Sequence, residues 1–196
     1  LYFAHPASSR AMEIGKEQEP MIAEWCRKNL SMREIVYAQD LPEIPFWMAT
    51  DCPMGASPDA FTPDMQTVLE FKTLVGATAI EYFGDDYTPY EEKKLAVWKD
   101  HGDQLLGQFI ARSSVEKILL VKYIFQDDDI LQDTGSPLAL WRGLVFEFKR
   151  ADYEESILEM KDRIRLFDAM IDAPINPSEF KKGEWFVDER GKLRKK

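Results

Sequence analysis

The sequence predicts a single α/β domain in which a central mixed β-sheet is flanked by helices. Three stretches show helical periodicity of apolar residues, and the segments between them alternate apolar and polar residues as strands do. The helices are expected over about 9–29, 90–111 and 152–171, and the main strands over about 58–73, 117–125 and 143–149. A chain of 196 residues with 45% hydrophobic content is large enough to bury one core.

The helix boundaries follow from caps and prolines. Ser8 or Ser9 caps the first helix, and Pro20 inside it is expected to cause a kink, because proline removes one hydrogen bond of the helix. The last helix ends before Pro174 and Pro177. Its apolar face is formed by Ile157, Met160, Ile164, Phe167 and Ile171. The stretch from Gly84 to Pro89 is expected to be a mobile segment in front of the middle helix.

A short apolar segment, Phe46–Ala49, follows a loop with two prolines and is expected to be a further strand. Trp47 within it is a candidate contact for a ligand, but burial in the core is the more common role of such an aromatic residue.

Acidic residues and a lysine lie on either side of a predicted turn. Asp59 precedes Thr62–Gln66, whose Pro and polar residues are typical of a turn, and Glu70-Phe71-Lys72 follows it. In the second strand Glu70 and Lys72 share one face, while Leu69 and Phe71 share the other. An antiparallel hairpin would therefore bring Asp59 alongside Glu70, with Lys72 just beyond.

Two close carboxylates repel each other, and burying either one without compensation is costly, so the pair calls for a cation. Carboxylate oxygens suit Mg²⁺ or Mn²⁺, which can polarise a phosphodiester and activate the attacking water. Lys72 would orient that water or stabilise charge on the phosphate. The alternative is an ordinary hairpin that carries a surface ion pair.

A second Glu-Phe-Lys triplet, Glu147–Lys149, shows that the triplet alone decides nothing. It lies in an alternating strand whose Leu144, Phe146 and Phe148 are expected to face inward, and no Pro-Asp lies one hairpin upstream. We interpret this copy as structural.

The segment from Ser57-Pro58-Asp59 to Glu70-Phe71-Lys72 resembles the signature of the PD-(D/E)XK nuclease superfamily. Two flanking segments, Met12–Ile22 and Asp103–Phe109, resemble the helical Gly-x-x-x-Glu motif and the glutamine-bearing helix of its lambda-exonuclease-like branch, the YqaJ-type viral recombinases. The resemblance spans about residues 10–170 and implies a restriction-endonuclease-like fold. It makes residues 1–180 the nuclease domain and leaves 181–196 as a basic C-terminal tail.

The resemblance also implies roles for individual residues. Asp59, Glu70 and the backbone carbonyl of Phe71 would hold one or two Mg²⁺ ions, for which Mn²⁺ is a substitute. Glu19 would assist the second ion, directly or through water. Lys72 and Gln104 would position the nucleophilic water. Gln108 lies one turn after Gln104 on the same helical face and is the second choice for the glutamine.

The activity implied by the resemblance is 5′→3′ exonuclease digestion of linear double-stranded DNA, which leaves 3′ single strands for homologous recombination. The expected partner is a single-strand annealing protein encoded in phage or prophage, and the expected assembly is a trimeric ring around DNA. The chain departs from the family at the arginine that binds the 5′-phosphate, because Arg10, close to the start of the chain, has no match to it. An endonuclease of the same superfamily and a non-catalytic DNA- or protein-binding domain are the alternatives.

The net charge of −10 is unusual for a DNA-binding protein, which draws affinity from basic residues at phosphates. From Lys181 onward seven Lys or Arg face three acids, a net of +4, which leaves −14 for the preceding 180 residues. This tail contacts the DNA backbone or is a solvated terminus. Enclosure of DNA by a ring would make high intrinsic affinity less necessary.

Other features of the sequence exclude several functions. No apolar run is long enough for a membrane span, so a cytoplasmic location, in a bacterium or a phage-infected host, is expected. Cys26 and Cys52 allow one disulfide at most and no zinc or iron–sulfur motif. His5 and His101 are far apart in sequence and are interpreted as structural. Asp127–Asp129 lacks the Gly and Glu of a calcium loop and is interpreted as a solvated turn.

Overall fold

The computed structural model describes residues 6–30, 32, 34–74, 89–124, 143–171, 185–187 and 193–195. The helices are α1 (Pro6–Asn29), α3 (Tyr90–Ala111) and α5 (Glu154–Ile171), with short 3₁₀ turns η1 (Ala38–Asp40) and η3 (Arg150–Tyr153). The strands are β1 (Val36–Tyr37), β2 (Trp47–Met48), β3 (Gly55–Ala56), β4 (Ala60–Phe61), β5 (Thr67–Leu74), β6 (Lys117–Ile124), β7 (Gly143–Lys149), β8 (Trp185–Val187) and β9 (Leu193–Lys195).

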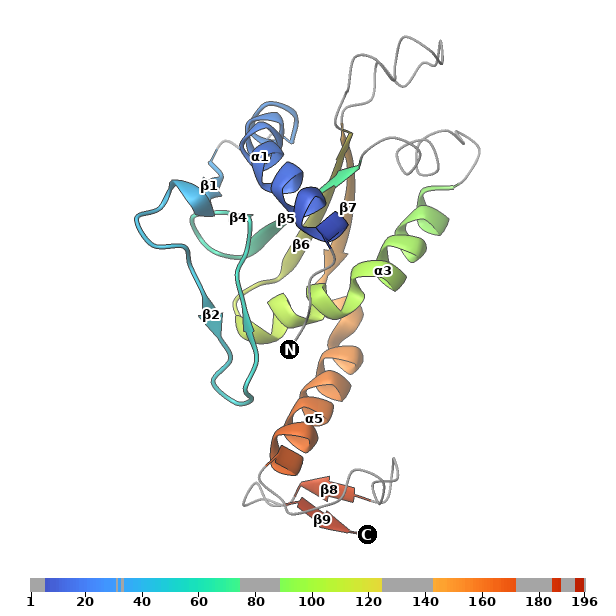
Figure 1. Ribbon diagram of the computed structural model, residues 1–196. Coiled ribbons are helices and arrows are strands. Elements are labelled where there is room, and N and C mark those ends of the chain that lie inside the picture. Colours follow the sequence, from blue (N-terminus) through green and yellow to red (C-terminus); the bar gives the residue numbers. More distant parts are fainter. Residues whose placement is uncertain are drawn as a thin grey trace.

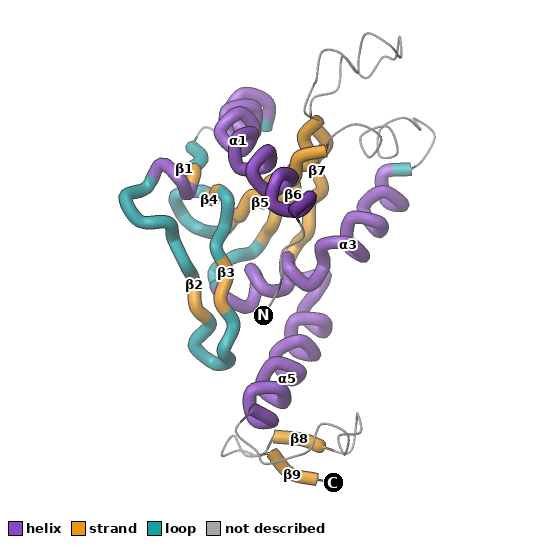
Figure 2. The backbone as a smooth tube through the Cα atoms, in the orientation of Figure 1, coloured by secondary structure: helices purple, strands orange, loops and turns teal. Residues whose placement is uncertain are grey.

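The predicted mixed sheet is confirmed. Its strand order is β1-β4-β5-β6-β7, and β5 and β6 run parallel while the other neighbours run antiparallel. The parallel pair requires a crossover connection, in which α3 lies. Figures 1 and 2 show α1 and α3 lying across the strands of the sheet, while α5 leads away from the lower end of β7 in this view. The three predicted helices and the strands over 58–73, 117–125 and 143–149 are present within a few residues of their expected bounds.

The sheet separates two hydrophobic cores, because alternate residues of β5 and β6 face opposite sides. On one side Val68, Ile118 and Leu120 pack against α3 and α5. On the other side Leu69, Phe71, Leu119 and Val121 pack against α1 through Ile22, Ala23 and Cys26. Both cysteines are buried and free, and they lie in different cores.

Several local expectations have clear outcomes. Trp47 is 8% exposed and packs against Phe61 with ring centroids 5.6 Å apart, so the core role is confirmed. Its strand β2 pairs only with β3, in a separate two-stranded sheet. α1 continues through Pro20 as one helix. The apolar face of α5 is buried at Ile157, but Phe167 is 65% exposed, so this predicted face does not stay buried along its whole length.

Three expectations fall outside the described residues: the segment 84–88, the acidic run Asp127–Asp129, and His5. Of the predicted tail, residues 185–187 and 193–195 form the antiparallel pair β8–β9. None of the described helices is long and apolar enough to cross a membrane.

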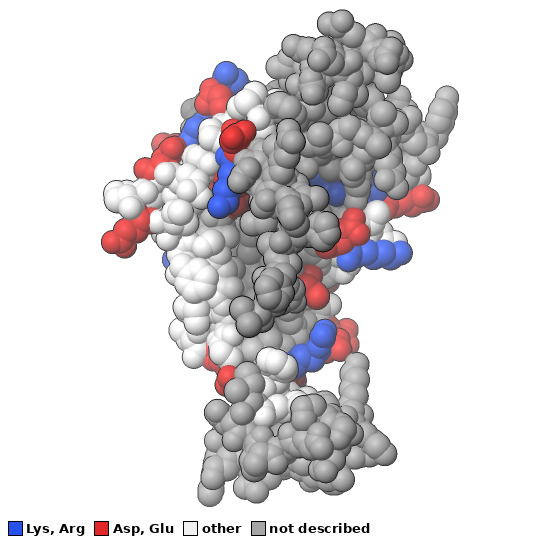
Figure 3. Space-filling model, in the orientation of Figure 1, with Lys and Arg blue, Asp and Glu red and all other residues white. Residues whose placement is uncertain are grey.

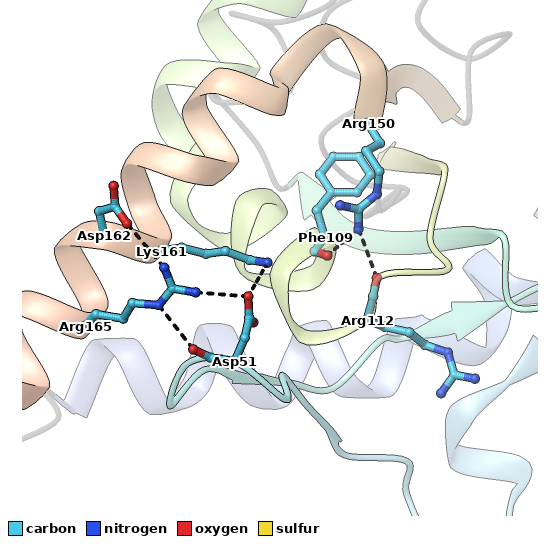
Figure 4. A network of polar contacts seen from close by, with 7 residues as sticks. All are labelled: Asp51, Phe109, Arg112, Arg150, Lys161, Asp162 and Arg165. Carbon is cyan, nitrogen blue, oxygen red and sulfur yellow. Dashed lines mark hydrogen bonds and ion pairs between the residues drawn. The ribbon is translucent and has the colours of Figure 1, made fainter. Parts of the chain in front are cut away.

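The C-terminal end of α3 is held by Arg150 at the end of β7. Its guanidinium donates to the backbone carbonyls of Phe109 and, at 3.0 Å, of Arg112 (Figure 4). It also donates to the carbonyl of Val115 at 2.6 Å. Phe109 lies in the last turn of α3, whose carbonyls have no partner within the helix, and Arg112 and Val115 follow the end of the helix. α3 is thereby fixed against the sheet at the end that lies closest to Gln108.

A second polar cluster in Figure 4 lies at the surface. Lys161 and Arg165 of α5 bind the Asp51 carboxylate at 2.9 and 3.1 Å, and Arg165 also bonds Asp162 at 3.3 Å. The Asp51 side chain is 44% exposed, so solvent screens these ion pairs.

We predict that Arg150→Met lowers the free energy of unfolding by about 2–4 kcal/mol, because three carbonyls lose a charged donor. Arg165→Met removes the same charge from the exposed cluster and should cost under about 1 kcal/mol. Urea unfolding of both variants checks this, and equal losses in the two would contradict the capping role of Arg150.

Candidate functional site

The register of the β4–β5 hairpin places Asp59 opposite Glu70. Ala60 pairs with Leu69 and Phe61 with Val68, so the next position outward on each strand is Asp59 on one side and Glu70 on the other. The turn between them is closed by Thr62, whose hydroxyl oxygen donates to Asp64 at 2.6 Å and accepts from the Thr67 amide at 3.1 Å. The hairpin predicted from the sequence is therefore present with the predicted register.

The backbone around Asp59 is fixed from both sides. The amide of Phe71 donates to Asp59 Oδ2 at 2.7 Å, and the Asp59 carbonyl accepts from the Ala38 amide at 2.9 Å. The Phe71 side chain points to the opposite face, where its ring packs 6.4 Å from that of Tyr37. The Glu70-Phe71-Lys72 triplet thus divides between the site and the core, as alternation along a strand requires.

Glu70 is the most enclosed residue of the site, with 2% of its surface exposed. Its Oε1 accepts from Lys72 Nζ at 2.5 Å and from Gln104 Nε2 at 2.6 Å, and its Oε2 accepts from Gln108 Nε2. A buried carboxylate is tolerated only when its oxygens find donors, and here one lysine and two amides supply them.

Both glutamines of α3 therefore contact Glu70. Gln104 is exposed at the mouth of the site, whereas Gln108 is 1% exposed and lies beneath it. Residues four apart on a helix share a face, so Gln104 and Gln108 both reach one carboxylate. Gln104 is placed to meet a ligand, and Gln108 is placed to hold Glu70.

Glu19 approaches the hairpin from α1. Its Oε2 accepts from the hydroxyl of Tyr37 at 3.2 Å, and Tyr37 pairs with Ala60 in the sheet. Tyr37 thus links the α1 glutamate to the strand that begins next to Asp59.

The pKa values of the acids show that they are close together. The pKa of Asp59 is raised to about 8, first by burial and then by the negative charge of Glu70, and to a smaller extent by that of Glu19. The hydrogen bond from the Phe71 amide and the charge of Lys72 lower it in part. Burial also raises the pKa of Glu19, which the Tyr37 hydrogen bond partly offsets before the charge of Glu70 raises it again. Without a cation the cluster favours a proton on one of its carboxyl groups.

The donor set fits a hard divalent cation in its chemistry. The candidate ligands are carboxylate oxygens. The buried Oε1 of Gln108 has no hydrogen-bond partner in the described structure, so it could accept from a water. Among the described residues, however, no three acidic, histidine or cysteine side chains already form a closed metal-binding group. One oxygen of Glu19, Oε2, is engaged by the Tyr37 hydroxyl.

The second triplet, Glu147–Lys149, lies on β7, where the side chains of Glu147 and Lys149 form surface ion pairs. Glu147 bonds Lys117 at 3.5 Å and Lys149 at 3.4 Å, while Phe146 and Phe148 are fully buried. The structural interpretation of this copy agrees with its contacts.

Two residues lie near the site without a predicted role there: His101, for which the sequence indicates a structural role, and Lys122. His101 lies one turn before Gln104 on α3, and burial together with the charges of Lys122 and Lys72 lowers its pKa to about 4. Lys122 on β6 is the register partner of Lys72. His101, Gln104 and Gln108 lie on one face of the helix, so their spacing could have placed the histidine beside the site. The proximity of Lys122 to Lys72 depends on how β5 and β6 align.

The charged side chains on the face shown in Figure 3 do not outline a path for DNA. On the face shown in Figure 3 the basic and acidic side chains of the described residues are interspersed. Attraction of a polyanion on this face would have to come from individual residues and bound cations rather than from a continuous basic stripe.

We predict that the metal-free protein loses stability as the pH rises from about 4 to about 8, because the folded state keeps a proton on Asp59 that the unfolded chain releases near its ordinary pKa. Asp59→Asn removes this dependence and is the more stable form at pH 8, by on the order of a few kcal/mol. Thermal unfolding in a chelating buffer between pH 4 and pH 9 measures both. If the stabilities of wild type and Asp59→Asn changed with pH in the same way, the raised pKa of Asp59 would be contradicted.

No family model matches the chain, and no curated relative matches its sequence. Two of the solved structures that match its fold are the following. An alkaline exonuclease from Laribacter hongkongensis superposes with a TM-score of 0.52 and 21% identity, over 83% of this chain and 69% of that one. A phage-related exonuclease from Haemophilus somnus has a TM-score of 0.50 and 12% identity, over 83% of this chain and 72% of that one. The chain therefore has the fold of these exonucleases, in agreement with the predicted lambda-exonuclease-like architecture.

Proposed function

We propose that this protein is a Mg²⁺-dependent deoxyribonuclease that degrades linear double-stranded DNA from its ends, in the 5′→3′ direction. The observation that carries the proposal is the hairpin register that sets Asp59 opposite Glu70, with Lys72 Nζ 2.5 Å from Glu70 Oε1. Two acids and a lysine so arranged supply the ligands and the donor that phosphodiester hydrolysis requires. The likeness to exonuclease folds supports the same reading.

In this proposal Asp59, Glu70 and the backbone carbonyl of Phe71 hold one or two Mg²⁺ ions, with Glu19 as a further ligand and Mn²⁺ as a substitute. The bound ion would supply Lewis-acid polarisation of the phosphate and an acidified water.

The residues of the chain orient the reactants. Lys72 and Gln104 both donate to Glu70 Oε1, so both donor groups lie next to the position that an ion or water bound to that oxygen would occupy. They would turn the attacking water toward the phosphorus and donate to the charge that develops on the phosphate. Gln108 keeps the carboxylate of Glu70 in place from below. Tyr37 keeps Glu19 beside the hairpin.

The biological setting follows from the resemblance. Digestion from 5′ ends would leave 3′ single strands for homologous recombination, with a single-strand annealing protein as the partner. A homotrimeric ring that encloses DNA would retain the substrate despite a net charge of −10, since capture reduces the need for phosphate contacts.

We predict that the protein with Mg²⁺ degrades 5′-phosphorylated linear duplex DNA and leaves covalently closed circular duplex intact. Lys72→Ala should lower the rate by about 10²-fold or more, because the donor at the reacting phosphate is lost. Lys149→Ala, the same change in the second triplet, should leave the rate unchanged. Release of label from the 5′ end before the 3′ end tests the polarity.

The outcomes separate the alternatives. Cleavage of the closed circle would identify an endonuclease. Equal rates in wild type and Lys72→Ala would overturn the mechanism, and wild type without Mg²⁺-dependent cleavage would leave a non-catalytic binding domain.

A further inference from the structure

Lys122 lies beside the candidate site on the neighbouring strand. The parallel register of β5 and β6 pairs Lys72 with Lys122, and side chains of register partners on adjacent strands point to the same face of a sheet. Strand neighbours lie about 4.8 Å apart, so the two lysines leave the sheet side by side. Lys122 is 2% exposed, whereas the side chain of Lys72 is 26% exposed. Lys122 is therefore the inner of the two.

A lysine is an unexpected residue at this position. The preceding residues of β6 on the same face, Ile118 and Leu120, are fully buried and apolar, and both pack in the core beneath α3. A buried ammonium costs free energy that an apolar side chain would not, so stability alone does not explain Lys122.

The surroundings of Lys122 hold charges of both signs. Burial lowers the pKa of Lys122 to about 8, the charge of Asp100 raises it, and the charge of Lys72 lowers it. His101 also faces it and is neutral at physiological pH, because burial and the two lysines depress its pKa while Asp100 raises it only in part. The part of α3 that carries Asp100 and His101 thus accommodates the ammonium of Lys122 next to Lys72.

We propose that Lys122 is a positioning residue of the nuclease site, whose ammonium supplies positive potential behind Lys72 at the place where the phosphodiester is bound. The inference rests on the proposed function. The resemblance to the nuclease signature assigns a role to Lys72 and none to Lys122.

The physical reason is the charge balance of the site. Lys72 forms its ion pair with Glu70 at 2.5 Å, so much of its charge is offset before a phosphate is bound. A second cation in a wall of low dielectric acts over several ångströms with little screening. Fixed before the substrate arrives, it stabilises negative charge in the transition state without reorganisation.

The test compares Lys122→Met, Lys122→Arg and Lys117→Met. Lys117 lies on the same strand, five residues away, where it pairs with Glu147 at 3.5 Å, so its replacement makes the same change in net charge far from the site. Cleavage of linear duplex DNA with Mg²⁺ at fixed ionic strength gives kcat and KM, and thermal unfolding of the same samples gives Tm.

Lys122→Met should lower kcat by about 10- to 100-fold with a smaller change in KM, since the potential acts mainly on the transition state. Its Tm should stay close to that of wild type, because the buried ammonium is replaced by an apolar side chain of similar length while the exposed carboxylate of Asp100 stays solvated. Lys122→Arg should restore part of kcat, and Lys117→Met should match wild type.

Each other result overturns the inference. An unchanged kcat in Lys122→Met, with an active wild type, removes the role of Lys122 and leaves the proposed function standing. A fall in kcat together with Tm, without rescue by Lys122→Arg, assigns Lys122 to the fold alone. A wild type that does not cleave DNA removes the proposed function and this inference with it.

Discussion

The antiparallel register between β4 and β5 is the constraint on which the candidate site depends. It is set by two residue pairs, Ala60 with Leu69 and Phe61 with Val68, and by a turn closed through the Thr62 hydroxyl. Since side chains alternate along a strand, a slip by one residue would turn Glu70 and Lys72 into the core beneath α1. The apolar pattern of β5 therefore fixes the position of the carboxylates as firmly as it fixes the core.

Around this hairpin the structure balances charges that could not be buried singly. Glu70 is enclosed by three donors, one from its own strand and two from α3. Asp59 has a backbone amide and the field of Lys72 to offset its two acidic neighbours, and its pKa near 8 shows that the compensation is incomplete. In the free protein a proton supplies the missing positive charge. A divalent ion bound at the site would supply it instead.

The sequence predicted the parts of this arrangement that are local. The long helices have clear periodicity, and the hairpin has a turn signal and alternating strands, so the facing of Asp59 and Glu70 could be derived from residues 59–72 alone. The two triplets could be told apart by the Pro58-Asp59 upstream of the first. In the described structure the charged side chains of the second triplet form surface ion pairs.

The parts that were missed depend on contacts between distant segments. β1 is two residues long, and its identity comes from pairing with β4 rather than from its own pattern. That Gln104 and Gln108 both reach Glu70 depends on how closely α3 lies on the sheet, which Arg150 helps to fix. Lys122 became a neighbour of Lys72 only through the parallel alignment of two strands some 50 residues apart, and no local pattern encodes that alignment.

The central claim, that Asp59 and Glu70 together form a site for a divalent cation, is tested most directly by Mn²⁺ binding without DNA. Calorimetric titration near pH 7 should show saturable binding to wild type, with release of a proton as the ion replaces the one on Asp59. Asp59→Asn should lose this binding, and Glu147→Gln, the same loss of a carboxylate in the second triplet, should keep it. Equal Mn²⁺ affinity in wild type and Asp59→Asn would contradict the account.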